Sequence, residues 1–320
     1  MPAPIRRREF LAGMAAMTAV HAASHFAPAN ESSSPFRIAV INDEISQDFG
    51  RACEVASREF GMQWIELRGM WKKNIVNLDE KEIAEARRIL QKYQIKVTDI
   101  ASPLFKVDWP GAPKSKYSEA KSFGATFTLS QQDEVLERAI AMAKAFGTDR
   151  VRCFDFWRLE DPAPYRAAIN DKLRDAAAKA EKKGIILVLE NEYACNTATG
   201  AESAKVLSEV QTPSLMLNWD PGNAAARGEI PYPDGYSHLP KERIGHCHCK
   251  DAVKKDNHYD WAPMGGGIID WAGQFRALKA DGYHYAVSLE THWNGGGSPE
   301  ESSRKSWAGM KKLLQQAGAL

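Results

Sequence analysis

Four apolar segments in the second half of the chain each end in, or are followed by, a side chain that can bind a metal ion. A carboxylate at the end of such a segment is costly to bury unless it is paired or bound to a cation. One carboxylate of this kind would be weak evidence, but here three carboxylates and one imidazole recur at four successive segment ends. The candidate ligands of one divalent metal are Glu190, Asp220, His248 and Glu290.

The third of these segments carries two histidines and two cysteines in alternation, His246-Cys247-His248-Cys249. Successive side chains of a strand point to opposite faces, so the two histidines share one face and the two cysteines share the other. This alternation argues against a mixed histidine–cysteine zinc site. His248 lies nearer the end of the segment and is the predicted ligand, whereas His246 is predicted to lie one layer deeper and to hydrogen bond within the site.

Three oxygen donors and one imidazole make a hard donor set. It suits Mn²⁺ best, then Mg²⁺ or Co²⁺, and Zn²⁺ also fits. A bound metal of this kind polarises a carbonyl and stabilises the enediolate that forms when the neighbouring carbon loses a proton. A carboxylate ligand with a free oxygen can act as the base, and Glu190 and Glu290 can flank the substrate from opposite sides because two other strands separate theirs.

The elements that must position these residues alternate regularly after Pro35. Short β-branched runs alternate with longer amphipathic runs, several of which stop at a glycine such as Gly147 or Gly184. The pattern predicts an α/β protein with one domain, a (β/α)8 TIM barrel over residues 36–320. A doubly wound sheet is the alternative, but no glycine-rich phosphate motif follows the first strand. The eight predicted strands are Arg37–Asn42, Gln63–Leu67, Lys96–Ala101, Asp149–Phe154, Ile185–Glu190, Ser214–Trp219, Ile244–Cys249 and Tyr285–Glu290.

Helices and long loops are predicted between the strands. Polar stretches at Pro103–Gln131, Asn223–Pro240 and Asp251–Gly267 follow strands, so they are predicted to be loops over the C-terminal mouth of the barrel, where sites are built. Their aromatic side chains, Trp109, Tyr232, Tyr236, Tyr259 and Trp261, are candidates for substrate walls. The predicted helices are Arg51–Phe60, Asp79–Tyr93, Gln132–Phe146, Pro162–Lys183, Ala201–Glu209, Trp271–Ala280 and Pro299–Gln316.

The N-terminal thirty residues have the pattern of an export signal. Arg6-Arg7-Arg8 precedes Phe10-Leu11 and an uncharged stretch at 12–20 that is too short to span a bilayer. Twin arginines followed by Phe-Leu resemble a Tat signal, and Ala27-Pro28-Ala29 offers a cleavage site. Residues 1–29 are therefore predicted to be a Tat-type signal peptide that directs the protein to the periplasm. No later segment is predicted to cross a membrane.

Composition excludes several other classes. Of the 320 residues, 44% are hydrophobic and the net charge is only +1, which gives no overall positive field for nucleic acid. The five cysteines are odd in number and scattered, so free, buried thiols are expected rather than disulfides. The oligomeric state is left open.

The residues of the predicted metal ring and their neighbours resemble the xylose-isomerase-like TIM-barrel superfamily, often called sugar phosphate isomerases/epimerases. The resemblance runs over nearly all of the chain from Phe36 onward. It rests on the Glu190 and Glu290 segment ends and on the motifs Asp43–Ser46, Trp64–Arg68, Trp219–Asn223 and His246–Asp251.

In the ketose 3-epimerases of this superfamily two glutamates both bind the metal and act as the acid–base pair. By resemblance these roles fall on Glu190 and Glu290. Those enzymes also carry a histidine three residues after the metal aspartate and an arginine six residues after the metal histidine. Here the two positions hold Asn223 and Lys254, which departs from the epimerase pattern.

The function predicted from these observations is isomerisation or epimerisation of a sugar or keto-sugar, a small carbohydrate, through an enediolate. One alternative is a lyase or dehydratase acting on an inosose or 3-keto-glycoside, with an acid supplied by His292 or Lys250. Another is an exported carbohydrate-binding protein without catalysis. Endonuclease IV shares the barrel but needs more histidines than the eight present. The candidate substrate contacts are Glu66, His246, Asn223, Lys250, Asp251 and His292.

Overall fold

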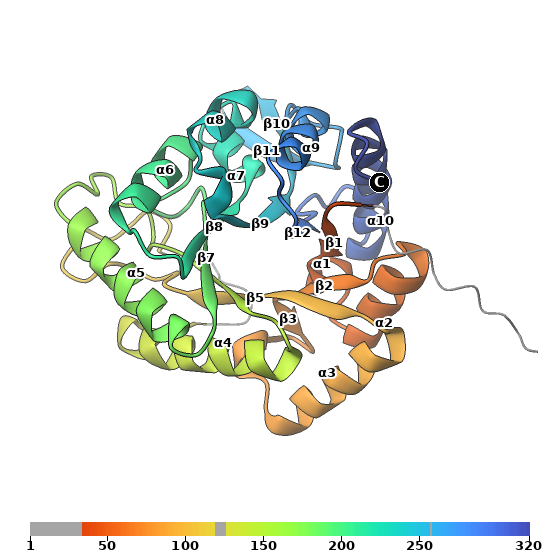
Figure 1. The fold of residues 1–320 in the computed structure, drawn as a ribbon, viewed down its shortest axis with the longest axis horizontal. Helices are drawn as coiled ribbons and strands as arrows, with labels where there is room; N and C mark the ends of the chain where they lie inside the picture. Colours follow the sequence, from red (N-terminus) through yellow and green to blue (C-terminus); the bar gives the residue numbers. More distant parts are fainter. Residues whose placement is uncertain (1–33, 119–125, 257) are drawn as a thin grey trace, which may run out of the picture. The chain divides into compact units, whose positions relative to one another are not determined.

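Eight parallel strands form one continuous sheet in a computed structural model that describes residues 34–118, 126–256 and 258–320. The predicted signal segment 1–29 lies outside the described residues. The order of the strands around the sheet is β1-β12-β9-β8-β7-β6-β5-β2 (Figure 1). Their bounds are β1 Arg37–Val40, β2 Trp64–Leu67, β5 Lys96–Leu104, β6 Arg150–Cys153, β7 Ile186–Glu190, β8 Leu215–Trp219, β9 Ile244–Cys249 and β12 Ala286–Leu289.

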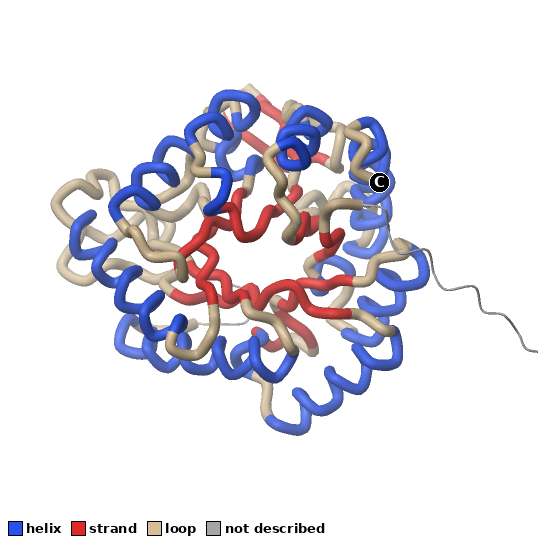
Figure 2. The backbone as a smooth tube through the Cα atoms, viewed as in Figure 1, coloured by secondary structure: helices blue, strands red, loops and turns tan. Residues whose placement is uncertain are grey.

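The sheet curls into a nearly closed barrel. Ladder pairing runs from β1 round to β2, and these two edge strands meet through one parallel bridge between Ile41 and Glu66. The strands form the inner ring and the helices surround it (Figure 2). The predicted (β/α)8 barrel is therefore confirmed, and each predicted strand overlaps an observed one.

The longer helices follow the sequence prediction. α3 begins with a capping box, in which Asp79 accepts from the backbone N–H of Glu82 and Glu82 accepts from that of Asp79. α4 stops at Gly147, whose φ of 72° is left-handed and free of strain only in glycine. The long helices are α3 Glu80–Tyr93, α4 Gln132–Phe146, α5 Arg166–Glu181, α6 Gly200–Glu209, α9 Trp271–Ala280 and α10 Pro299–Gln316. Among the described residues, none of the helices has both the length and the apolar character needed to cross a membrane.

The connections contain more regular structure than the sequence predicted. The predicted loop Asp251–Gly267 holds an antiparallel hairpin, and Asn223–Pro240 is partly helical. The predicted helix Arg51–Phe60 is instead two elements, α2 and a π-helical η1. The short elements are α1 Asn42–Ile45, α2 Phe49–Glu54, η1 Val55–Glu59, β3 Gly69–Met70, β4 Lys73–Asn74, η2 Ile75–Asn77, η3 Leu129–Gln131, α7 Pro221–Ala226, η4 Pro231–Gly235, α8 Tyr236–His238, η5 Lys241–Arg243, β10 Asp251–Lys255 and β11 His258–Ala262.

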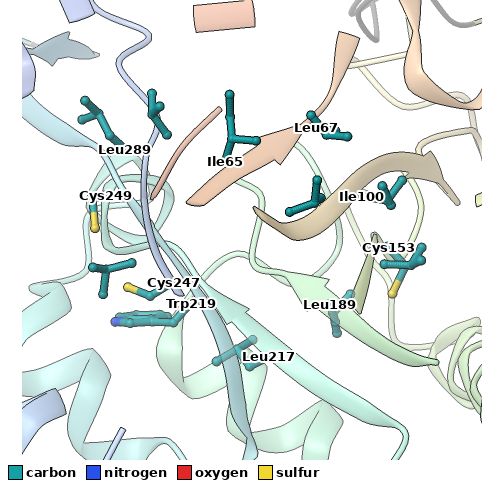
Figure 3. Close-up of a cluster of buried hydrophobic side chains, with 14 of the residues drawn as sticks. Ile65, Leu67, Ile100, Cys153, Leu189, Leu217, Trp219, Cys247, Cys249 and Leu289 are labelled. Atoms are coloured by element: carbon teal, nitrogen blue, oxygen red, sulfur yellow. The ribbon is translucent and has the colours of Figure 1, made fainter. Parts of the chain in front are cut away.

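A hydrophobic layer holds the barrel together. Alternate side chains of the strands, including Leu189, Trp219 and Cys247, are fully buried in one apolar cluster with side chains of the helices (Figure 3). Each buried Leu, Phe or Met side chain contributes about 1.5–3 kcal/mol relative to exposure. All five cysteines are free and buried, as the sequence predicted.

Several of the other alternate positions of the strands are polar, and they too are buried. Glu66 on β2, Asp99 on β5, Arg152 on β6, Asn218 on β8 and His246 on β9 are at most 6% exposed. Burying so many polar groups is unfavourable unless they pair with one another. This polar interior forms the floor on which the site is built.

Candidate metal centre

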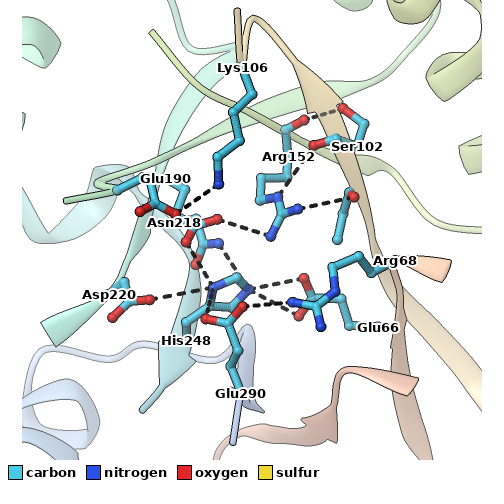
Figure 4. A network of polar contacts seen from close by, with 12 residues as sticks. Glu66, Arg68, Ser102, Lys106, Arg152, Glu190, Asn218, Asp220, His248 and Glu290 are labelled. Atoms are coloured by element: carbon cyan, nitrogen blue, oxygen red, sulfur yellow. Dashed lines mark hydrogen bonds and ion pairs between the residues drawn. The ribbon is translucent and has the colours of Figure 1, made fainter. Parts of the chain in front are cut away.

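The four predicted metal ligands converge at the C-terminal ends of adjacent strands. Glu190 ends β7, Asp220 follows β8, His248 lies on β9 and Glu290 follows β12. Each offers one ligand atom, and these atoms all lie within 4.8 Å of one another. All four side chains are at most 2% exposed. In Figure 4 the three carboxylates surround the ring of His248.

The imidazole of His248 is held with one nitrogen toward the carboxylates. Its Nε2 lies 3.0 Å from a carboxylate oxygen of Glu66, which can only accept, so Nε2 carries the hydrogen. Its Nδ1 lacks a hydrogen-bond partner among the described residues and lies 3.5 Å from Glu190 Oε1 and Glu290 Oε2 and 3.8 Å from Asp220 Oδ2. A neutral imidazole nitrogen facing three carboxylates fits a divalent metal.

Charge around His248 favours a positive charge at this nitrogen. Burial alone would lower the pKa of His248, but Glu66, Glu290 and Glu190 together raise it well above its usual value. A proton or a metal cation on Nδ1 would be stabilised by the same negative charges.

Two asparagines fix the carboxylates. Asn223, at the start of α7, donates from Nδ2 to Glu190 Oε1 at 3.1 Å and to Asp220 Oδ2 at 3.0 Å. Asn191 accepts from the backbone N–H of Asp220 at 2.7 Å and donates to its carbonyl oxygen at 2.8 Å. Asp220 itself caps α7 by accepting from the backbone N–H of Asn223. Ligating carboxylates with such partners are oriented before a metal arrives.

Lys250 enters the ring from the residue after β9. Its ammonium donates to Glu290 Oε2 at 2.7 Å and lies 2.9 Å from Asp220 Oδ2, with 2% of the side chain exposed. Burial lowers the pKa of Lys250, but Asp220 and Glu290 outweigh burial and raise it well above its usual value. Lys250 is therefore charged, and it balances part of the negative charge of the ring.

Two arginines pair with the predicted catalytic glutamates. Arg152 Nη1 lies 3.0 Å from Glu190 Oε2, and Arg68 Nη1 lies 3.1 Å from Glu290 Oε1. Burial raises the pKa of Glu190, but Arg152 and then His248 lower it to about 2. Burial likewise raises the pKa of Glu290, whereas His292 and Lys250 hold it well below its usual value. Both glutamates are thus ionised near neutral pH, the state that a metal ligand and a base require.

The structure places the predicted substrate contacts at different depths. Asn223 and Lys250 touch the metal ligands directly. Glu66 and His246 lie beneath the ring, fully buried, with His246 Nε2 3.0 Å from Glu66 Oε2. Glu66 therefore binds the two histidines of β9 and is not open to a sugar hydroxyl from above.

The remaining two candidates lie further out. His292 is at the rim, with its side chain 36% exposed and its Nδ1 3.6 Å from Glu290 Oε1. Asp251 turns to the loop that follows β11, where its carboxylate accepts from the backbone N–H groups of Gly265 and Gly267 at 3.0 and 3.1 Å. Asp251 thus shapes a loop and does not face the ring.

Several residues of the site had no role predicted from the sequence. Arg68, Arg152 and Asn218 each touch a metal-ligand candidate or its hydrogen-bond partner. Arg152 and Asn218 are polar side chains inside the buried strands β6 and β8, and this position within a buried strand is the signal that could have found them. Glu44 binds Arg68 at 2.6 Å and also accepts from the backbone N–H of His292.

The barrel and its ring of carboxylates define a class of metal-site TIM barrels. The model of the family "Xylose isomerase-like TIM barrel" matches residues 55–313, and the chain belongs to this family. The resemblance seen in the sequence motifs is thereby confirmed. A search of curated protein sequences gave no match.

Several solved structures share the fold at low sequence identity. A probable 3-DHS dehydratase from Bacillus anthracis is 19% identical, with a TM-score of 0.65 over 87% of this chain and 99% of that one. A xylose isomerase-like protein from Mycobacterium smegmatis, solved with magnesium, is 16% identical, with a TM-score of 0.64 over 89% and 98%. A D-allulose 3-epimerase from a Methylomonas species, solved with D-allulose, is 18% identical, with a TM-score of 0.63 over 88% and 98%. At these identities the similarity establishes the fold alone.

Proposed function

We propose that this chain is a divalent-metal-dependent enzyme that removes a proton next to a carbonyl of a sugar or keto-sugar, giving isomerisation or epimerisation. The observation that carries the proposal is the convergence of Glu190, Asp220, His248 and Glu290, with the unpaired Nδ1 of His248 among the three carboxylates. The family includes epimerases and dehydratases among its solved relatives. Mn²⁺ and Mg²⁺ are the first metals to test, because the donor set is rich in carboxylates.

In this proposal the metal ligands, the two glutamates and the two arginines have separate roles. A metal held by the four ligands would polarise the carbonyl and stabilise the enediolate. Glu190 and Glu290 come from strands separated by two others in the sheet, so they can serve two faces of one substrate carbon. One glutamate takes the proton, and the other returns a proton to the opposite face or to the neighbouring carbon. Arg152 and Arg68 keep the two glutamates ionised before the transfer.

Elimination from the same enediolate is the second candidate. Lys250 and His292 both lie against Glu290, at 2.7 Å and 3.6 Å, and both are residue types that can serve as a general acid. A lyase or dehydratase needs such an acid in addition to the base. The two candidates differ in whether the product retains the leaving group.

The test uses the chain without residues 1–29, loaded with Mn²⁺ or Mg²⁺ and incubated in D₂O with keto-sugars, inososes and 3-keto-glycosides. NMR follows deuterium entry and release of a leaving group. Deuterium in an otherwise intact sugar supports the isomerase or epimerase, and release of water or an aglycone supports the lyase. Glu290→Gln is expected to slow exchange by about 10²–10⁴-fold, whereas Glu137→Gln on the exposed surface of α4 leaves it unchanged. If none of these substrates shows metal-dependent deuterium exchange, the proposal is contradicted.

A further inference from the structure

A groove lies over the mouth of the barrel next to the metal centre. One hollow of about 470 Å³ is lined by Tyr117, Tyr193, Arg227, Tyr259 and Trp261, among others. A second hollow of about 730 Å³ is lined by residues 113–117 and 158–161 and again includes Tyr117 and Arg227. The two hollows are neighbours that share Tyr117 and Arg227, and together they are here called the outer groove.

A row of aromatic rings connects the outer groove to the metal centre. The ring centroids of Tyr117 and Tyr193 are 6.0 Å apart, and those of Tyr193 and Trp261 are 6.1 Å apart. Trp261 in turn carries the ammonium of Lys250 at 4.7 Å from its ring centroid. Since Lys250 donates to Glu290, the row of rings begins at the predicted catalytic glutamate and ends in the outer groove.

The rings of this row are not fully buried in the core. Tyr117, Tyr193, Tyr259 and Trp261 are all partly exposed, although large aromatic side chains are normally driven into a core. Each combines an apolar ring face with a hydrogen-bonding tip, the combination that binds a ring bearing hydroxyl groups. Arg227, at the end of α7, is exposed and forms no ion pair within the described parts of the chain, so its guanidinium is available to hydroxyl oxygens.

The size of the groove decides what class of ligand it fits. Small-molecule sites typically have volumes of roughly 300–1,000 Å³, and each hollow alone falls in this range. A single sugar ring that reacts between Glu190 and Glu290 is held beside the metal centre and leaves the outer groove unfilled. The groove is thus a second compartment, open to solvent, for a further part of the same molecule.

We propose that the substrate is a glycoside of at least two rings, whose reacting sugar ring carries a keto group and lies at the metal centre and whose second ring lies in the outer groove. The second ring stacks on aromatic side chains that line the outer groove, Tyr259 among them, and Arg227 donates hydrogen bonds to its polar groups. This inference rests on the proposed function for the placement of the reacting ring. It holds equally for an isomerase and for a lyase.

The test compares ligands that differ only in the second ring. Calorimetry on the metal-loaded chain would use the methyl glycosides of glucose, galactose, mannose and xylose. Each is paired with a disaccharide and a phenyl glycoside that begin with the same sugar. In at least one set, the two-ring ligand is expected to bind about tenfold more tightly than its methyl partner. Preference for the disaccharide or for the phenyl glycoside identifies the second ring as a sugar or an aglycone.

Variants locate the preference in the outer groove. Tyr259→Ala and Arg227→Ala are expected to weaken two-ring ligands by about three- to tenfold and to leave methyl glycosides unchanged. Tyr259→Phe keeps the ring and retains most of the gain, and Arg87→Ala on the exposed face of α3 has no effect. If Tyr259→Ala disturbs the β10–β11 hairpin, Arg227→Ala still tests the groove, since it lies outside that hairpin.

The outcomes separate this inference from the proposed function. If no two-ring ligand binds better than its methyl partner, or if neither groove variant changes the preference, the two-ring substrate is refuted. Deuterium exchange on one-ring sugars would then still support the proposed function. If two-ring ligands bind in the groove but no substrate exchanges a proton, the two-ring binding site is supported and the proposed reaction is contradicted.

Discussion

Glu66 shows how a single buried carboxylate can orient a candidate metal ligand. Its oxygens lie 3.0 Å from Nε2 of both His246 and His248, at full burial. By holding the hydrogen on Nε2, Glu66 leaves Nδ1 of His248 free to face Glu190, Asp220 and Glu290. The side chain that we predicted to contact substrate thus has a different place in the site.

Glu66→Gln tests this orienting role. The amide keeps the shape of the side chain but has one accepting oxygen in place of two and loses the charge. Affinity for Mn²⁺ is expected to fall by about 10–100-fold while the far-ultraviolet circular dichroism stays unchanged. Titration calorimetry measures the affinity, with Glu137→Gln as the surface control. Unchanged metal affinity in the Glu66 variant would remove Glu66 from the site.

Asp99 is the least satisfied carboxylate in the barrel interior. Both of its oxygens lack a hydrogen-bond partner among the described residues, and burial raises its pKa to about 6 even though His246 opposes the shift. A carboxyl group whose pKa is raised in the folded state keeps its proton where the unfolded chain has lost it. Its contribution to stability is therefore full below about pH 4 and falls as pH rises to about 6.

Asp99→Asn removes this pH dependence. The stability of the variant relative to the original chain is expected to be higher at about pH 7.5 than at about pH 5, by on the order of 1 kcal/mol. Urea unfolding at the two pH values measures the difference. Glu137→Gln on the exposed surface of α4 serves as the control for removal of a carboxylate. If the variant instead gains more stability over the original chain at the lower pH than at the higher pH, the raised pKa of Asp99 is contradicted.

At the scale of elements, the loop after β11 depends on one side chain. Asp251 accepts from four backbone N–H groups, those of Ala252, Gly265, Gly267 and Ile269. A side chain at Gly267 would have no room, since an added Cβ would lie 2.1 Å from Asp251 Oδ1. The carboxylate of Asp251 therefore ties the loop at 265–269 to the start of the β10–β11 hairpin, in addition to the backbone hydrogen bond from Ile268 to Ala252.

Asp251→Ala leaves these four donors without their acceptor. We expect the variant to lose on the order of 2–4 kcal/mol of stability and its hydrogen exchange at residues 265–269 to accelerate. Asp260→Ala, which removes an exposed ion pair with Lys255 on the same hairpin, should cost less than about 1 kcal/mol. Equal effects of the two variants would show that the loop does not depend on Asp251.

The sequence predicted the regular elements well and the connections poorly, for a physical reason. β7 is a continuous apolar run that ends in Glu190, and β9 alternates histidine with cysteine, so both their existence and the face of His248 follow from local pattern. The β10–β11 hairpin is polar and half exposed, and no such pattern marks it. The depth of Glu66 likewise depends on how β2 meets β9 across the barrel, which no local pattern encodes.

At the scale of the whole molecule, the barrel is joined where β1 and β2 share only the bridge between Ile41 and Glu66. The ring of ligands spans β7, β8, β9 and the end of β12, so a metal there links four strands that are far apart in sequence. A ligand that binds the folded chain and not the unfolded one stabilises it according to its concentration and affinity.

Removal of metal is therefore expected to destabilise the whole barrel. Chelation with EDTA should lower the melting temperature, and Mn²⁺ or Mg²⁺ added at about 100 times its dissociation constant should restore about 3 kcal/mol of stability. Differential scanning calorimetry measures the change. Asp220→Asn serves as the control, since a chain that cannot hold the metal should not respond to it. A chelator effect that persists in this variant would locate the metal elsewhere.

The central claim, that Glu190, Asp220, His248 and Glu290 together hold one divalent cation, is tested most directly by counting the metal. Elemental analysis of the protein after equilibration with Mn²⁺ and removal of free ion should give about one metal per chain. His248→Ala should give close to none, with circular dichroism showing that the barrel remains folded. One tightly bound metal that survives in His248→Ala, or none in the original chain, would contradict the account of this site.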